Sequence, residues 1–218
     1  TTGKGTVRGF SKIYTILQPN NNTMTHDLQL RPFRSPADEG WAEAMTIYRE
    51  AFPRRERRDD ATQAAALADP AFRAEGIWLN DKIAGLVFYW EHPEFHYIEH
   101  LALSPAMRAR NIGSEVLETF CRNRRVILEI EPPEDTLTVR RLRFYERAGF
   151  VANPHSYIHP SYGEPAEPHR LVLMSSPKAL GDDEVRRFAD FVRERVMGYS
   201  QLKTPPTQPR LRQAKAPK

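Results

Sequence analysis

The chain has 218 residues, enough for one domain of moderate size with a real hydrophobic core. Its net charge of +4 comes from the two ends, because residues 1–26 and 203–218 carry Lys and Arg without a single acid, while the body between them is acidic. This distribution argues against a nucleic-acid-binding core. The single cysteine, Cys121, excludes an intramolecular disulfide, and no apolar run approaches the ~20 residues of a membrane span, so we expect a cytoplasmic protein without membrane contact.

The N-terminal third predicts strands around two helices. Residues 27–33 alternate apolar and polar side chains, as an edge strand does, and residues 37–52 show helical spacing of large apolar side chains. The charged run at 54–60 is expected to be a solvated surface, although Glu56 in it is a weaker candidate for substrate contact. Residues 61–68 predict a second, short helix.

Two further strands follow as a hairpin. Residues 72–79 and 83–90 are rich in β-favouring side chains and are separated by Asn80 and Asp81, which suit a tight turn. Gly85 in the second strand is a position where a cofactor or another backbone could come close.

Residues 97–120 predict a strand that runs into a helix. An apolar strand at 97–103 is broken at Ser104 and Pro105, and helical spacing begins again at Ile112. A helix start has unpaired backbone N–H groups and a positive dipole end, so the connector at 108–114 could hold a phosphate. Gly113 and the small Ser114 would let an anion approach the backbone closely.

This connector resembles the pyrophosphate loop of the GNAT acetyltransferase superfamily, whose pattern is Gln/Arg-x-x-Gly-x-Gly/Ala after a strand ending in Leu-Ala-Val and a Pro. Asn111 replaces the first glycine, and the turn stays available because Asn enters positive φ more readily than most residues. The resemblance implies that acetyl-coenzyme A is bound by Leu101, Ala102, Leu103, Arg108, Ala109, Arg110, Asn111, Ile112, Gly113 and Ser114.

Two glutamates lie in the strands on either side of that helix. Strict alternation puts Glu99 on an apolar face, so either that face opens into a cleft or a bulge between Glu99 and Leu101 changes the alternation; pairing across the sheet is the third alternative. Residues 126–131 predict a mostly buried strand that carries Glu129. If the two strands diverge as in the resembling family, a cluster of Glu99, Glu129 and Glu131 would favour a cationic amine.

A second signature lies in the helix predicted at 136–148. Its segment RRLRFYERAGF resembles a family helix that ends Phe-Tyr-Glu-x-x-Gly-Phe. From spacing alone, Tyr145 is a core aromatic, whereas the resemblance implies that it protonates the departing thiolate. Thr138 stands where the family often has an Asn and could offer its hydroxyl to pantetheine.

The remaining histidines and aromatic residues leave alternatives open. His92, His96 and His100 recur every four residues, but Pro93 favours a turn and strand over a helix, so no metal site is expected. The predicted loop at 153–168 contains three side chains that either face the acceptor or anchor the loop: Tyr157, His159 and Tyr162. A last strand at 171–174 and an amphipathic helix from residue 182 to about 199 follow.

The resemblance implies an α/β fold, described as α+β by some schemes: a mixed, mostly antiparallel twisted sheet with splayed central parallel strands, flanked by helices, plus a C-terminal extra helix. We expect a flexible N-terminal extension (1–26, with Met24 a candidate natural start), a GNAT acetyltransferase domain (27–176), a helix beside it (177–202) and a disordered basic tail (203–218).

The implied function is direct transfer of acetyl from acetyl-coenzyme A to a primary amine of a small molecule or peptide. Tyr145 is the expected acid, and Glu99 or Glu129 is the expected base. Two alternatives stay open, a coenzyme A-binding module without activity and a partner-binding protein that acts through its C-terminal helix. No metal and no nucleic acid are expected, and a homodimer is left open.

Overall fold

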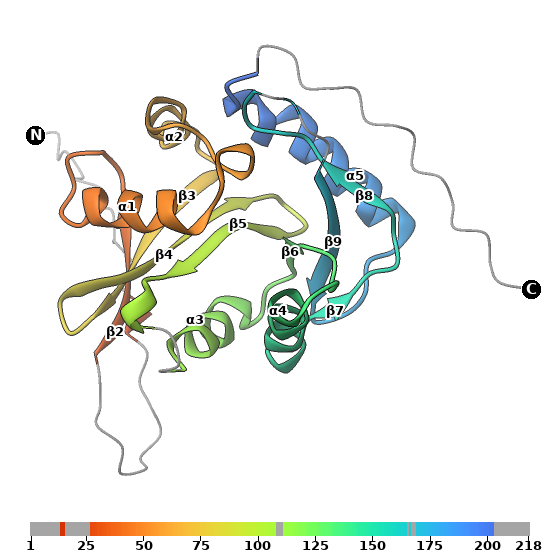
Figure 1. Ribbon diagram of the computed structural model, residues 1–218, viewed down its shortest axis with the longest axis horizontal. Coiled ribbons are helices and arrows are strands. Elements are labelled where there is room, and N and C mark those ends of the chain that lie inside the picture. Colours follow the sequence, from red (N-terminus) through yellow and green to blue (C-terminus); the bar gives the residue numbers. More distant parts are fainter. Residues whose placement is uncertain (1–13, 16–26, 108–110, 165, 167–168, 203–218) are drawn as a thin grey trace, which may run out of the picture.

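The computed structural model describes residues 14–15, 27–107, 111–164, 166 and 169–202. Within these ranges nine strands form a sheet in the order β1-β2-β3-β4-β5-β6-β9-β7, with β8 paired to β9 (Figure 1). The strands are β1 Tyr14–Thr15, β2 Leu28–Phe33, β3 Phe72–Leu79, β4 Lys82–Glu91, β5 His96–Leu103, β6 Val126–Ile130, β7 Val151–Ala152, β8 Tyr157–His159 and β9 His169–Ser176.

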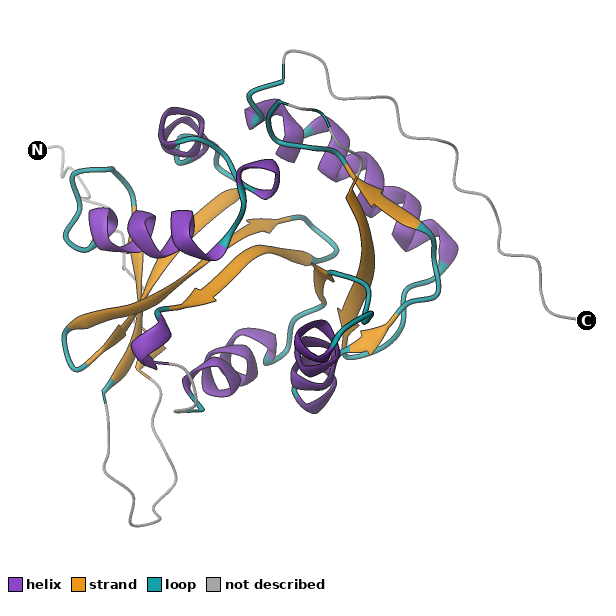
Figure 2. Cartoon of the chain, viewed as in Figure 1, coloured by secondary structure: helices purple, strands orange, loops and turns teal. Residues whose placement is uncertain are grey.

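Helices cover both faces of the sheet (Figure 2). They are α1 Trp41–Ala51, α2 Asp60–Ala66, α3 Ile112–Cys121, α4 Thr136–Arg147 and α5 Asp182–Glu194, with short 3-10 turns at η1 Arg54–Glu56, η2 Pro105–Met107 and η3 Val196–Tyr199. One apolar core is formed with α1, α2 and α5, and a second, on the opposite face, with α3 and α4. The apolar stripe of each helix is the side that it turns toward the sheet.

The central strands β5 and β6 are parallel over a short stretch and then separate. Their pairing joins His96, Tyr97 and Ile98 to Val126, Ile127 and Leu128, and every other strand pair in the described sheet is antiparallel. Helix α3 supplies the crossover that a parallel pair requires. The predicted fold class, including the splayed central parallel strands, is confirmed.

A bulge in β5 is centred on Glu99. On β4, Phe88 pairs with His100 and the next residue, Tyr89, pairs with Ile98, so Glu99 is the extra residue. Gly85 lies further along the same pair of strands, where a Cβ atom would stand 2.3 Å from the carbonyl oxygen of Ala102. The close approach expected at Gly85 is therefore made by a neighbouring backbone.

The predicted hairpin is confirmed, and its turn residues have the conformation that Asn and Asp tolerate. Asn80 has φ 48° and Asp81 has φ 58°, as a type I′ turn requires, and Leu79 pairs with Lys82 across it.

Three local expectations differ from the structure. Helix α1 begins at Trp41 rather than at residue 37, because the side chain of Asp38 accepts from the backbone N–H groups of Arg34 and Ser35 and holds a turn there. Strand β2 is not the outermost strand, since β1 pairs with it at two residues within the expected N-terminal extension. Strand β8 lies within the expected 153–168 loop; residues 1–13, 16–26 and 203–218 lie outside the described part of the chain.

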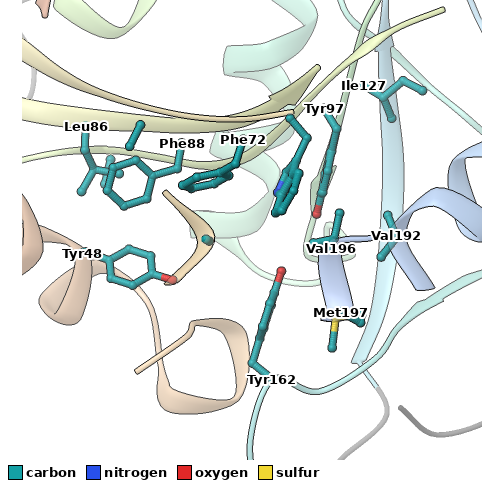
Figure 3. Close-up of a cluster of buried hydrophobic side chains, with 14 of the residues drawn as sticks. Tyr48, Phe72, Leu86, Phe88, Tyr97, Ile127, Tyr162, Val192, Val196 and Met197 are labelled. Carbon is teal, nitrogen blue, oxygen red and sulfur yellow. The ribbon is translucent and has the colours of Figure 1, made fainter. Parts of the chain in front are cut away.

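The C-terminal helix packs on the sheet. Val185, Phe188, Ala189 and Val192 of α5 are buried in the same core as Tyr97 of β5. Figure 3 shows Val192, Val196 and Met197 beside Tyr97. Among the described residues, none of the helices combines the length and the apolar character that crossing a bilayer requires.

Candidate active site

A cavity of about 640 Å³ lies where β5 and β6 separate. Gly113 at the start of α3 lines it together with Phe144 and Tyr145 of α4. Its acidic side chains come from five glutamates, namely Glu50, Glu56, Glu99, Glu129 and Glu131. The cavity therefore joins a helix start, suited to an anion, to carboxylates that suit a cation.

The helix start has the geometry that the sequence predicts. Asn111 adopts the left-handed conformation with φ 61° and is the N-cap of α3, so it takes the place of a glycine in the turn. Its carbonyl oxygen accepts from the amide N–H groups of Ser114 (3.0 Å) and Glu115 (3.2 Å). The amide of Ser114 is thus occupied, and the earlier amides of Ile112 and Gly113 are the ones that an unpaired helix start presents to an anion. Arg108, Ala109 and Arg110 lie outside the described residues.

The end of β5 borders the cavity along its length. Leu101, Ala102 and Leu103 all line it, and on the β6 side they have no strand partner among the described strands because the parallel pairing stops at Ile98. Alternate backbone N–H groups of an unpaired strand edge point away from the strand, here toward the cavity.

Glu99 forms a buried ion pair with Arg58. The side chains are 1% and 0% exposed, and Arg58 Nη2 lies 2.7 Å from Glu99 Oε1 while Nη1 donates to Oε2 at 2.8 Å. Trp90 Nε1 also donates to Oε2, at 2.9 Å, and the hydroxyl of Tyr162 donates to Oε1. Burial alone would raise the pKa of Glu99, but Arg58 outweighs burial and holds this pKa at about 2.

The charged run at 54–60 is therefore only partly the solvated surface expected from sequence. Arg54 and Arg55 are exposed, but Arg58 is fully buried and donates from Nη2 to the backbone oxygen of Val196 at 3.1 Å. Glu56 lines the cavity and is half-buried. The expectation was wrong for Arg58, because a buried carboxylate 41 residues away requires the guanidinium, and it was wrong for Glu56, which lies against Arg55 and His169.

Glu129 occupies a different environment. Its side chain is 8% exposed, Oε2 accepts from the hydroxyl of Tyr97 at 2.8 Å, and Oε1 is buried without a hydrogen-bond partner among the described residues. His159 Nε2 lies 3.9 Å from Oε2. Burial raises the pKa of Glu129 while His159 opposes the rise. The hydroxyl of Tyr157 also acts on this carboxylate and lowers its pKa, and no Lys or Arg of the described chain pairs with it.

Glu56 is a third glutamate in the lining of the cavity. Glu56 Oε1 is 3.3 Å from Arg55 Nη2 and 3.5 Å from His169 Nε2, and burial raises the pKa of this carboxyl. His100 donates from Nε2 to the backbone oxygen of Glu56 at 2.9 Å, and burial lowers the pKa of His100 to about 4, so the imidazole is neutral at pH 7.

Tyr145 lines the cavity beside Phe144, and its ring contacts Phe150 at a centroid distance of 5.7 Å. Burial raises the pKa of its phenol to about 12, so the hydroxyl keeps its proton at neutral pH. Thr138, by contrast, caps α4: its hydroxyl hydrogen-bonds Asp135 Oδ1 at 2.9 Å, and its amide donates to that same oxygen at 2.8 Å. The hydroxyl of Thr138 is used in the capping box that it forms with the N-cap residue Asp135, and Thr138 does not line the cavity.

Sequence reasoning missed Arg58 and Trp90 as partners of Glu99, because no local spacing links them to it. It left His159 and Tyr162 open between two roles, and both line the cavity. Within the described chain, no group of three or more His, Cys, Asp or Glu side chains could hold a metal ion.

The chain matches the model of the acetyltransferase (GNAT) family over residues 39–150, just over half of its length. It is 25% identical over 167 residues to a Bacillus subtilis (strain 168) protein named "Putative acetyltransferase YjbC", a match that covers 75% of this chain and 84% of that protein.

Solved structures agree with this match. A "Putative acetyltransferase from GNAT family" from Bacteroides thetaiotaomicron superposes with a TM-score of 0.72 at 26% identity, covering 78% of this chain and 98% of that one. An acetyltransferase from Thermus thermophilus has the same fold, with a TM-score of 0.50 at 19% identity, covering 69% and 97%. The chain belongs to the GNAT acetyltransferase family.

Proposed function

We propose that this protein is an N-acetyltransferase that moves acetyl from acetyl-coenzyme A to a primary amine by direct attack in a ternary complex. The observation that carries the proposal is the cavity between β5 and β6, which joins the start of α3 to Glu129. Family membership supports acetyl transfer in general, and the acidic lining supports a cationic acceptor. The catalytic domain in this proposal is residues 27–176, and a cytoplasmic location and a homodimer stay predictions.

The donor would lie along β5 with its diphosphate at the start of α3. The amides of Ile112 and Gly113 and the positive end of the helix dipole favour a phosphate there. Gly113 keeps this approach open, since a Cβ atom on it would stand 3.2 Å from the ring of Phe144. The thioester would then lie beside the unpaired edge of Leu101, Ala102 and Leu103.

The acceptor amine must lose a proton before it attacks. A lysine-like amine with a pKa of ~10.4 is mostly protonated at pH 7, and freeing it costs roughly 4–5 kcal/mol. Of the two candidate bases, Glu129 is better suited, because its pKa is raised and no Lys or Arg of the described chain pairs with it. Glu99, with a pKa of about 2 and a full set of hydrogen bonds, holds Arg58 and the bulge in place.

The attack creates an oxyanion and then a leaving thiolate. Backbone N–H groups on the unpaired edge of β5 would stabilise the oxyanion. Full proton transfer from Tyr145, with a pKa of about 12, to a thiolate of pKa ~8.5 is uphill by roughly 5 kcal/mol. Tyr145 would therefore act mainly by a hydrogen bond that stabilises the thiolate, and the proton follows as the thiolate leaves.

The test is a panel of primary amines incubated with acetyl-coenzyme A, with detection of free thiol and of the acetylated product. The Tyr145→Phe variant should turn over about 10-fold or more slowly than wild type while binding acetyl-coenzyme A unchanged. The matched control is Tyr199→Phe, whose hydroxyl bonds Asp69 away from the cavity and should not change turnover. Binding of acetyl-coenzyme A without thiol release on any amine would contradict the proposal, and unchanged turnover in Tyr145→Phe would remove Tyr145 from the mechanism.

A further inference from the structure

His159 lines the cavity and is held in one orientation. It lies at the end of β8, its side chain is 5% exposed, and its Nδ1 is 2.6 Å from the backbone oxygen of Pro160. A carbonyl oxygen can only accept a hydrogen bond, so Nδ1 carries the hydrogen. In the neutral imidazole the other nitrogen, Nε2, is therefore a bare acceptor.

This bare nitrogen faces the carboxylate that the proposed function uses. Nε2 of His159 is 3.9 Å from Oε2 of Glu129, and both side chains line the cavity. Two acceptors that face each other in a buried site repel, and one proton between them turns the contact into an attraction. No Lys or Arg side chain pairs with Glu129 in the part of the chain that the structure describes, so the pair has room for one positive charge.

We propose that His159 shares with Glu129 the proton taken from the acceptor amine, so that the base of this enzyme is a carboxylate–imidazole pair. This inference rests on the proposed function and names a residue that acts in it. The ammonium N–H bond breaks, its proton passes to the Glu129–His159 pair, and the electron pair left on nitrogen attacks the thioester. The second proton lost as the amide forms goes to the thiolate, and the shared proton leaves to solvent, so one proton is released per turnover.

The titratable groups that face the pair are phenols, a second carboxylate and two further histidines. Tyr97 from β5 and Tyr157 from β8 face Glu129, and burial raises the pKa of both phenols, so they stay protonated. Tyr162 lies against His159 at a ring distance of 5.2 Å and donates to Glu99, which stays ionised. His100 and His169 also act on His159, and burial lowers the pKa of both.

The first experiment needs no substrate. In protein labelled with ¹⁵N-histidine, NMR should show His159 with hydrogen on Nδ1 and a bare Nε2, and the ¹⁵N shift of Nε2 should change in Glu129→Gln because the carboxylate that faces it is removed. Hydrogen on Nε2, or an Nε2 shift that Glu129→Gln leaves in place, would overturn the proposal whether or not any amine is acetylated.

The second experiment follows kcat/KM against pH with an amine from the panel. His159→Asn keeps a side-chain N–H for the oxygen of Pro160 but has no atom in the place of Nε2. Loss of the partner raises the pKa of Glu129, so the acidic limb should move to higher pH by about one unit or more, with binding of acetyl-coenzyme A unchanged. His155→Asn is the control, because His155 pairs with Asp182 outside the cavity. An acidic limb that does not move in His159→Asn would overturn the proposal.

Discussion

Glu99 and Glu129 lie on neighbouring strands, and both have buried side chains that line one cavity, yet their partners and the directions of their pKa shifts differ. Glu99 has a guanidinium, an indole N–H and a phenol directed at it, and Arg58 holds its pKa at about 2. Glu129 has phenols and one imidazole near it but no guanidinium among its described partners, and burial raises its pKa. The comparison shows that a buried carboxylate with a guanidinium partner has a lowered pKa and one without such a partner has a raised pKa, and the raised pKa suits the base proposed at Glu129.

The largest expected effect of breaking this difference is on catalysis. Glu129→Gln should lower kcat/KM by about 10²- to 10⁴-fold at neutral pH, because the amide cannot accept the proton of the ammonium. Its fold should hold, since the change removes a buried acid that has no Lys or Arg partner in the described chain. Rates of thiol release with the best amine of the panel measure this effect.

Glu131→Gln is the matched control, because Glu131 is partly exposed at the cavity and pairs with Arg141. It should keep activity within about threefold of wild type. Equal losses in the two variants would mean that the cavity needs negative charge in general rather than a base at Glu129.

The next largest effect is on stability. Arg58→Met should lower the free energy of unfolding by about 3–5 kcal/mol, because it leaves the carboxylate of Glu99 buried without its cation. Urea unfolding measures the change, and Arg54→Met, at an exposed position of the same run, is the control. The double variant Arg58→Met/Glu99→Gln should recover much of the loss, and a double variant no more stable than Arg58→Met would contradict the ion-pair account.

The same pair predicts how stability depends on pH. Glu99 has a pKa of about 2 in the fold and ~4.3 when unfolded, so its contribution is present above about pH 4.3 and is lost as pH falls toward 2. The loss should amount to about 3 kcal/mol, measured by urea unfolding between pH 5 and pH 2. The double variant should lack this part of the dependence, whereas Glu134→Gln, at an exposed position, should retain it.

The sequence predicted those features that rest on local pattern. The hairpin turn at Asn80 and Asp81 and the left-handed Asn111 follow from the preference of these residue types, and the strand–helix order around Asn111 follows from the change in apolar spacing. The bulge at Glu99 was one of three alternatives, because an acid among apolar residues requires an exception to alternation but does not say which.

The features that were missed depend on contacts between distant segments. Arg58 and Glu99 are 41 residues apart, and a run of alternating charges looks the same whether one of its arginines is buried or not. His159 was left open between two roles, and the role proposed for it depends on the carbonyl of Pro160 and on Glu129, which is 30 positions away along the chain. Neither pairing leaves a periodicity in the sequence, so side-chain coordinates were required.

The smallest expected effect is at the loop proposed to bind the cofactor, where a substitution should leave the effects of both carboxylates unchanged. Asn111→Gly should change the free energy of unfolding by less than about 1 kcal/mol, since glycine relieves the left-handed backbone but loses more entropy on folding. Acetyl-coenzyme A should bind up to about 10-fold more tightly, because a side chain is removed where the diphosphate passes. Calorimetric titration measures this affinity, and weaker binding would show that the Asn111 side chain contributes to the site.

Asn111→Gly should leave two other measurements in place: the acidic limb of kcat/KM against pH, proposed to depend on Glu129, and the stability at low pH that depends on Glu99. The described partners of both residues lie elsewhere. A shift in either would mean that the loop and the carboxylates are coupled through β5, and the contrast between Glu99 and Glu129 would then belong to the whole cavity.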